Sequence, residues 1–259
     1  MKSAVRTALV LLLSVLLAPP ALSRMAVAEA TRGDVCAIRQ FEGSAFTVCE
    51  YRPGRDELRL ALNGSGGSPL GGFRALARDL GPDSGRVLFA MNGGMYDRAQ
   101  APVGLLVQSG RQVHGADTAE GRGNFYLKPN GVFSVGPDGH VRVEETGAFL
   151  ARGGPTQWAT QSGPLLLQGG RMHPAVAPDG ASLAIRNGVG LRTPNQAYFV
   201  ISNQPVSFGR LARFFRDGLG CGDALYLDGA VSSLWAPSLG RRDGRTGLGP
   251  LIVILAAQP

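Results

Sequence analysis

Short apolar runs that end at glycine or proline are the feature that most limits the fold of this chain. The sequence has 259 residues, of which 38 are glycine and 17 are proline. Runs such as residues 224–227 (ALYL) and 251–255 (LIVIL) have the length of buried strands. Many such strands separated by turns indicate a β-rich α+β single domain, with a mixed or antiparallel sheet and two or three helices.

Two segments have the period of an amphipathic helix. Apolar residues spaced i, i+3, i+4, i+7 predict one over residues 73–80, which Gly81 and Pro82 end. Ser207 is a suitable N-cap for the other. The apolar face of this second helix consists of Phe208, Leu211, Ala212 and Phe215. Further strands are predicted at residues 35–41, 44–50, 57–62, 86–91, 103–107, 111–114, 124–128, 132–135, 140–144, 165–168, 182–186 and 197–202.

The helix and strand signals do not alternate regularly. This order argues against a doubly wound parallel sheet. The sequence also has no GxGxxG fingerprint and no Walker-type P-loop. We therefore expect no cofactor.

The first residues have the pattern of a targeting signal. Lys2 and Arg6 precede an apolar run over residues 9–17, which is far shorter than the roughly 20 residues of a membrane-spanning helix. Small residues then offer two cleavage sites, after Ser23 or after Ala28. The choice between these two sites stays open.

We therefore predict a signal peptide over residues 1–28 and one domain over residues 29–259. Removal of the signal peptide lowers the formal net charge of +7 to about +4. The remaining charges are scattered, which argues against a nucleic-acid partner. We expect a periplasmic or secreted protein without a stable membrane span, and the sequence does not predict its oligomeric state.

The three cysteines suggest one disulfide, since exported proteins meet an oxidising environment. If Glu42 and Gly43 form a two-residue loop, Cys36 lies directly opposite Cys49 in a hairpin. Cys221 is left over, and we interpret it as a small buried residue. No CxxC motif or Cys/His cluster is present, so the sequence predicts no metal site.

A carboxylate follows the apolar run in CGDALYLDGAVSSLWAP, residues 221–237. Asp228 stands at the end of this run and is followed by the small residues Gly229, Ser232 and Ser233. A strand-end carboxylate with small neighbours suits the floor of a binding site. The alternative is that Asp228 only caps its own turn.

Other stretches repeat this design. FAMNGGMYDR, residues 89–98, places Asn92 after an apolar run and before two glycines. AIRNGVGL, residues 184–191, places Arg186 directly after a short apolar run. A further stretch is QSGPLLL, residues 161–167.

Together, and in their order along the chain, the four stretches resemble the phosphodiester glycosidase family. The resemblance extends from about residue 86 to the C-terminus. One departure is that Ala230 replaces the second glycine of the Asp-Gly-Gly expected at the acidic turn. The resemblance implies hydrolysis of a sugar-1-phosphodiester at the glycosidic C–O bond, with a phosphorylated sugar or glycan as substrate.

The resemblance also implies roles for individual residues. Asp228 is the candidate catalytic carboxylate, Arg186 the candidate clamp for the leaving phosphate, and Asn92 a candidate hydrogen-bond donor. The candidate substrate-binding residues are Gly93, Gly94, Tyr96, Ser162, Gly163, Gly229, Ser232 and Ser233.

A short internal repeat of the sequence relates Asn92 and Asp228. Residues 76–78 and 211–213 both read Leu-Ala-Arg, and they end 14 and 15 residues before Asn92 and Asp228. We infer two helix–strand units that bring both polar residues to the same rim of the sheet. Coincidence in a glycine-rich chain is the alternative.

Three other functions stay open. Ser232 or Ser233 could be the nucleophile of a serine hydrolase, although no GxSxG elbow and no neighbouring histidine supports it. The chain could also be a non-catalytic polysaccharide-binding or envelope-assembly module. A metal-dependent phosphodiesterase that attacks phosphorus is the third.

Overall fold

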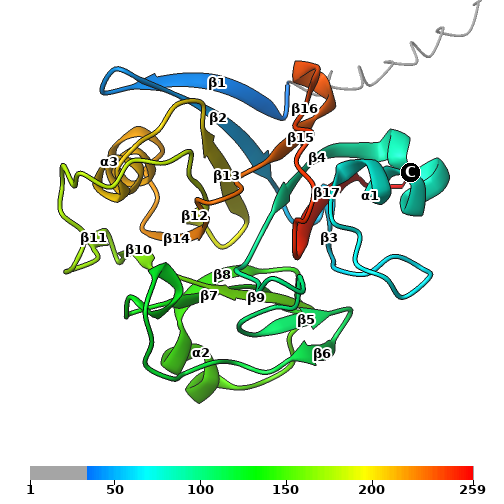
Figure 1. Cartoon of the computed structure of the whole chain (residues 1–259), viewed down its shortest axis with the longest axis horizontal. Coiled ribbons are helices and arrows are strands. Elements are labelled where there is room, and N and C mark those ends of the chain that lie inside the picture. Colours follow the sequence, from blue (N-terminus) through cyan, green and yellow to red (C-terminus); the bar gives the residue numbers. More distant parts are fainter. Residues whose placement is uncertain (1–33, 259) are drawn as a thin grey trace, which may run out of the picture. The chain divides into compact units, whose positions relative to one another are not determined.

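Three antiparallel sheets and three α-helices make up the part of the chain that the structure describes (Figure 1). The structure is a computed structural model, and it describes residues 34–258. The predicted signal peptide lies outside the described residues. No helix between residues 34 and 258 is long and apolar enough to cross a membrane.

The largest sheet has seven strands in the order β1-β2-β13-β12-β14-β10-β11. These are β1 (Cys36–Phe41), β2 (Ser44–Tyr51), β10 (Leu165–Gln168), β11 (Arg171–Met172), β12 (Asn187–Thr193), β13 (Gln196–Ser202) and β14 (Asp223–Asp228). In the β1–β2 hairpin Cys36 pairs with Cys49, and the two form a disulfide. The predicted register and the predicted disulfide are both confirmed. Cys221 is free and buried.

The other two sheets have five strands each. The second has the order β16-β15-β4-β17-β3 and the third the order β6-β5-β9-β7-β8. The second contains β3 (Asp56–Ala61), β4 (Val87–Asn92), β15 (Leu234–Ala236), β16 (Arg241–Arg242) and β17 (Leu251–Ala256). The third contains β5 (Leu106–Gln108), β6 (Arg111–His114), β7 (Gly131–Val135), β8 (Val141–Glu145) and β9 (Trp158–Ser162).

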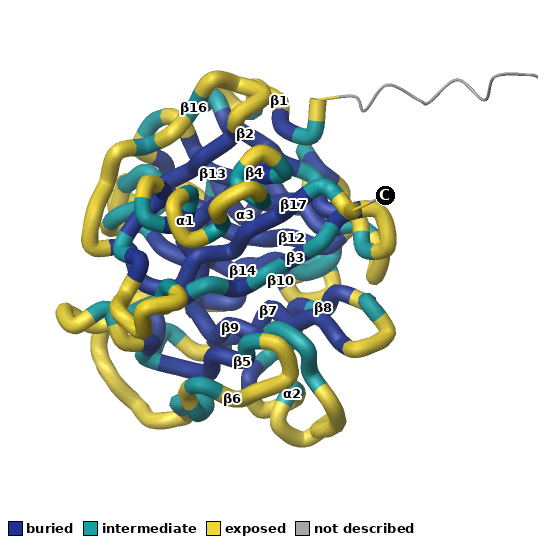
Figure 2. Tube along the Cα trace, turned by 90° about the vertical axis from the view of Figure 1, so that its right-hand side faces the viewer, coloured by how far each residue is buried: buried dark blue, intermediate teal, exposed yellow. Residues whose placement is uncertain are grey.

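The three sheets share one apolar core. Phe89 of β4, Phe133 of β7 and Phe199 of β13 come from different sheets and are all fully buried. The ring of Phe199 lies 5.5 Å, between centroids, from each of the other two. Figure 2 shows the buried strands as a continuous inner layer. Strands β14 and β17 are buried along almost their whole length, which agrees with the continuous apolar runs at residues 224–227 and 251–255.

A helix covers the outer face of each sheet. Apolar side chains of α3 pack on the seven-stranded sheet, those of α1 on the second sheet and Phe149 of α2 on the third. The helices are α1 (Phe73–Leu80), α2 (Thr146–Arg152) and α3 (Phe208–Arg213), which continues into the π-helical turn η3 (Phe214–Gly218). Three 3₁₀ turns are η1 (Gly81–Arg86), η2 (Asn124–Tyr126) and η4 (Pro237–Leu239). Ser207 caps α3 by accepting a hydrogen bond from the Arg210 amide, as predicted.

Two sequence expectations about these elements were wrong, and one helix was missed. The segment predicted as a strand over residues 124–128 begins with η2, because β7 pairs with β8 and β9 instead of folding back on it. Residues 182–186 are not a strand, and only Ala184 forms an isolated bridge. Helix α2 was not predicted; the side chain of Glu145 caps it by accepting from the Ala148 amide.

Candidate active site

The ends of two strands meet at the candidate site. Asn92 is the last residue of β4 and Asp228 the last residue of β14. Asn92 Nδ2 donates a hydrogen bond to Asp228 Oδ2 over 3.0 Å, and both side chains are buried. The two helix–strand units therefore converge. They belong to different sheets, however, so the expectation of a single sheet rim was wrong.

The amide of Asn92 has a fixed orientation. Its Oδ1 accepts hydrogen bonds from the Ser233 backbone amide (2.8 Å) and from Asn187 Nδ2 (3.2 Å). Asn187 Nδ2 also donates to the backbone carbonyl of Asn92 over 2.8 Å. Since two donors hold the oxygen, the nitrogen of Asn92 must point at Asp228. The contribution of Asn187, which is fully buried, was not predicted from the sequence.

The carboxylate of Asp228 is held but not covered. It keeps 7% of its accessible surface, and its Oδ1 accepts from the backbone amides of Ala230 (2.8 Å) and Val231 (3.4 Å). Burial raises the pKa of Asp228 above its usual value, while these amides, that of Gly229 and the Asn92 side chain pull it partly back. Ala230 does not have a left-handed backbone, so the turn does not need the glycine that the family pattern has there.

A cleft of ≈ 660 Å³ opens at Asp228. This volume lies within the roughly 300–1,000 Å³ that is typical of small-molecule sites. Its walls include Tyr96, Arg98, Asn124, Tyr226, Asp228 and Gly229. The side chain of Tyr96 is partly buried. Burial and the nearby Asp228 charge raise the pKa of its phenol to about 12, so Tyr96 is neutral at ordinary pH.

Arg186 lies behind this cleft and does not line it. Only 2% of the residue is exposed. Its Nε donates to the Val206 carbonyl (2.9 Å), and one terminal nitrogen donates to the carbonyl and hydroxyl oxygens of Ser182 (2.9 and 3.1 Å). The other terminal nitrogen donates to the Tyr226 hydroxyl over 3.3 Å. The protein already occupies most of the guanidinium donors, so this geometry does not favour Arg186 as a direct clamp for a phosphate.

No carboxylate of the described residues pairs with Arg186. Its guanidinium carbon instead lies 3.6 Å from the ring centroid of Phe208. Desolvation lowers the pKa of Arg186, but an arginine stays charged under all ordinary conditions. The positive charge is thus buried and uncompensated, directly behind the floor of the cleft.

The hydroxyl of Tyr226 connects that charge to the cleft. A Cβ at Gly229 would stand 1.9 Å from the Tyr226 hydroxyl and 3.4 Å from the terminal nitrogen of Arg186, so only glycine fits above them. Burial raises the pKa of Tyr226 to about 12, which keeps the phenol protonated. Its oxygen accepts a hydrogen bond from the terminal nitrogen of Arg186, and Asn124 lines the same cleft. The proton of the hydroxyl is therefore free for a ligand.

The glycines after Asn92 are used for packing. The Gly93 amide donates to the Pro250 carbonyl over 2.9 Å, and a Cβ there would stand 2.3 Å from Ile252. Gly94 has φ 92° and leaves no room beside Thr160. The structure places both glycines behind the cleft, where they allow β4 to approach its neighbours closely.

Four other residues predicted to bind substrate instead bond to the backbone or pack around the site. Ser162 donates its hydroxyl to the Leu227 carbonyl over 3.0 Å. Gly163 is packed against neighbouring backbone, where a Cβ would not fit. The hydroxyls of Ser232 and Ser233 donate to backbone carbonyls over 2.7 and 2.8 Å. None of these four lines the cleft, whereas Tyr96 and Gly229 do.

Tyr226 is the main residue that the sequence reasoning missed. It was interpreted as one apolar member of the strand ALYLD. The signal was present, since Tyr226 and Asp228 are two positions apart and side chains alternate along a strand.

Between residues 34 and 258, no three His, Cys, Asp or Glu side chains cluster in a way that could hold a metal ion.

Comparisons with known proteins identify the family and the fold. The sequence profile of the phosphodiester glycosidase family matches residues 85–247. The chain is 36% identical over 210 residues to the uncharacterized protein YigE of Escherichia coli K12, covering 80% of each chain. Its fold is similar to the catalytic domain of zebrafish N-acetylglucosamine-1-phosphodiester alpha-N-acetylglucosaminidase in a form auto-inhibited by its pro-peptide. That match has a TM-score of 0.60 and 14% identity, over 88% of this chain and 85% of the other.

A candidate exported protein from Burkholderia pseudomallei has a similar fold as well. Its TM-score is 0.54 at 13% identity, over 82% of this chain and 74% of the other. The structural matches support the fold, and the sequence profile covers most of the described residues. The chain therefore belongs to the phosphodiester glycosidase family.

Proposed function

We propose that this protein is an exported hydrolase that cleaves a sugar-1-phosphodiester at the glycosidic C–O bond. The observation that supports this most directly is the hydrogen bond from Asn92 to Asp228 at the floor of the cleft. Asp228 thereby offers one ionisable carboxylate, which hydrogen bonds hold in a fixed orientation and which faces the cleft. Membership of the phosphodiester glycosidase family supports the same reaction.

In the proposed reaction the bond between the anomeric carbon and the phosphate oxygen breaks. The electron pair leaves with the phosphate, which needs little protonation because it is already a good leaving group. Asp228 either attacks the anomeric carbon itself, in which case water then hydrolyses the glycosyl ester, or takes the proton of the attacking water. Both routes pass through an oxocarbenium-like state, which a nearby carboxylate charge stabilises.

Tyr226 and Arg186 act together on the leaving phosphate in this proposal. The free proton of the Tyr226 hydroxyl donates to a phosphate oxygen as negative charge develops there. Arg186 positions that hydroxyl and adds a positive charge that no carboxylate of the described residues neutralises. Arg186 is thus a positioning residue, whereas Tyr226 would contact the substrate.

The geometry gives less support to the serine hydrolase. Both serine hydroxyls donate to backbone carbonyls, and neither is hydrogen-bonded to a histidine. A glycan-binding module without catalysis makes a different prediction, namely binding without turnover. The cleft itself is compatible with either binding or catalysis, so an assay of turnover separates them.

The test is a panel of sugar-1-phosphodiesters offered to the mature protein and to Asp228→Asn. We expect wild-type turnover, with a loss of roughly a hundredfold or more in the variant and retained binding. Hydrolysis in ¹⁸O-labelled water should place the label in the sugar. Label in the phosphate would indicate attack on phosphorus, and an equally active Asp228→Asn would remove Asp228 from the mechanism.

The proposed location of the protein is outside the cytoplasm. The Cys36–Cys49 disulfide fits a protein that folds in an oxidising compartment. The structural match to a candidate exported protein points the same way. Fractionation of cells that express the full chain, followed by N-terminal sequencing, tests both the location and the cleavage site. Full-length protein in the cytoplasmic fraction would contradict export.

A further inference from the structure

A second groove, lined by arginines, opens beside the cleft. It has a volume of ≈ 440 Å³ and lies between α1 and residues 243–247. Gln100 and Gly247 line both the groove and the cleft at Asp228, so the two hollows share a wall. Gln100 holds this wall in place, because its Nε2 donates to the Leu248 carbonyl over 2.9 Å.

Three arginines face the groove without partners. Arg74 and Arg78 come from α1 and Arg245 from the facing segment. Their side chains are exposed and form no hydrogen bond or ion pair with any residue in the described part of the chain. Arg245 precedes by two residues Gly247, which lines both the groove and the cleft.

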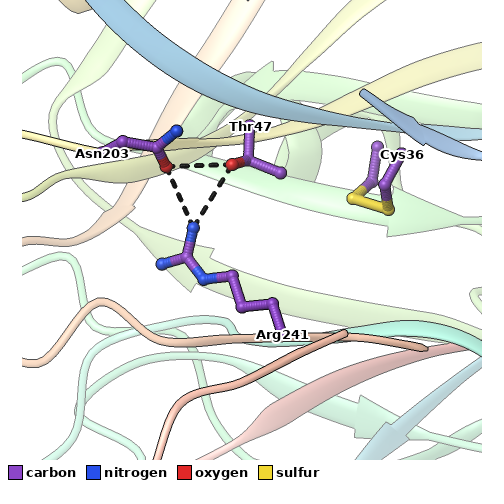
Figure 3. The surroundings of a disulfide bond; sticks show 5 residues. Cys36, Thr47, Asn203 and Arg241 are labelled. Carbon is purple, nitrogen blue, oxygen red and sulfur yellow. Dashed lines mark hydrogen bonds between the residues drawn. A yellow bond between two sulfur atoms is a disulfide. The ribbon is translucent and has the colours of Figure 1, made fainter. Parts of the chain in front are cut away.

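The carboxylate that lines this groove is already neutralised. Asp243 accepts from Arg241 through both of its oxygens (3.1 and 2.9 Å) and from the Leu234 amide (2.9 Å). Arg241 itself donates hydrogen bonds to Thr47 of β2 and to Asn203, which follows β13, as Figure 3 shows. This network fixes one wall of the groove and leaves the charges of the three arginines without an opposing carboxylate.

We propose that this arginine groove binds a second anionic group of the substrate, which makes the preferred substrate a glycan chain with more than one phosphate. The inference rests on the proposed hydrolysis at Asp228 for its link to catalysis. Arginine suits the recognition of phosphate oxygens, because its planar guanidinium offers several donors at once. A chain that places one phosphodiester above Tyr226 would continue past Gln100 into the groove.

The first experiment measures substrate preference. Two synthetic substrates share the same sugar-1-phosphodiester bond, and one carries an additional phosphate beyond it. We expect the wild-type kcat/KM to favour the doubly phosphorylated substrate by about tenfold, since exposed charge contacts are worth at most about 1 kcal/mol each. The preference should decrease as the salt concentration increases.

Matched variants locate the effect. Arg74→Gln/Arg78→Gln removes two charges from the groove, and Arg39→Gln/Arg111→Gln removes two exposed arginine charges from β1 and β6. We expect the preference to approach one in the groove variant and to stay at the wild-type value in the control. Melting temperatures should confirm that both variants fold. A wild-type preference of one, or an equal loss in both variants, would overturn the proposal.

The second experiment separates the groove from the catalytic proposal. Inorganic tripolyphosphate is titrated calorimetrically into the mature wild-type protein and both variants. Weaker binding in the groove variant alone supports an anion site, even if no sugar-1-phosphodiester is hydrolysed. Tripolyphosphate binding in the groove together with a wild-type preference of one would assign the site to a free anion, and it would overturn the substrate assignment. Equal binding by all three proteins would overturn the site.

Discussion

Tyr226→Phe is the sharpest test of the charge behind the cleft. The substitution removes one hydroxyl from a fully buried ring and leaves the volume almost unchanged. In the proposed mechanism this hydroxyl donates to the leaving phosphate, and the loss of one such donor typically costs about 10²–10³ in kcat. The terminal nitrogen of Arg186 also loses its 3.3 Å partner, which we expect to cost about 1–3 kcal/mol of unfolding free energy.

The assay varies the leaving group. Substrates that release a phosphate monoester of poorer leaving ability depend more on the hydroxyl, so Tyr226→Phe should slow them more than it slows substrates with a good leaving group. Tyr198→Phe is the matched control, because Tyr198 is buried on β13 and its hydroxyl accepts from Gln196 Nε2 over 3.0 Å. An equal loss for every leaving group, or a similar loss in Tyr198→Phe, would refute the role assigned to Tyr226.

Three further predictions concern the same site and the disulfide. Because the pKa of Asp228 is raised and its ionised form is the active one, activity should decline on acidification at a higher pH than for an ordinary carboxyl group; a pH–rate profile with no such limb contradicts this. Gly229→Ala should abolish turnover in a folded protein, since its methyl group would meet the Tyr226 hydroxyl; an active variant argues against that close approach. Cys36→Ala/Cys49→Ala should lose about 3 kcal/mol of unfolding free energy in guanidinium titrations, given the sequence separation of 13, and a loss below about 1 kcal/mol would be inconsistent with the loop-closure argument.

The parts of the fold that were predicted correctly depend on local geometry. The register of the first hairpin follows from its two-residue loop, and the pairing of Cys36 with Cys49 follows from the register. The start of α3 follows from the capping hydroxyl of Ser207. In each case the residues involved are close in sequence, so the physical cause is contained in the local pattern.

The parts that were missed depend on contacts between distant segments. The sequence could relate Asn92 to Asp228 through their similar units, but which sheet each strand joins is decided by the common core. An arginine after an apolar run normally reaches solvent. Arg186 instead turns inward, because the carbonyls of Ser182 and Val206 accept hydrogen bonds from its guanidinium. The local sequence around Arg186 does not predict these partners.

The site divides its charges between a buried set and an exposed set. Asp228 and Arg186 are buried and held by several hydrogen bonds each, so their positions change little as a substrate enters. The arginines of the second groove are exposed on α1 and on residues 243–247, and they form no bonds that hold the fold together. Substitutions in the exposed set should therefore alter which glycans are preferred, while the geometry around Asp228 stays intact. In the proposed function, selection of the substrate and the chemistry of cleavage are thus carried by residues that can vary separately.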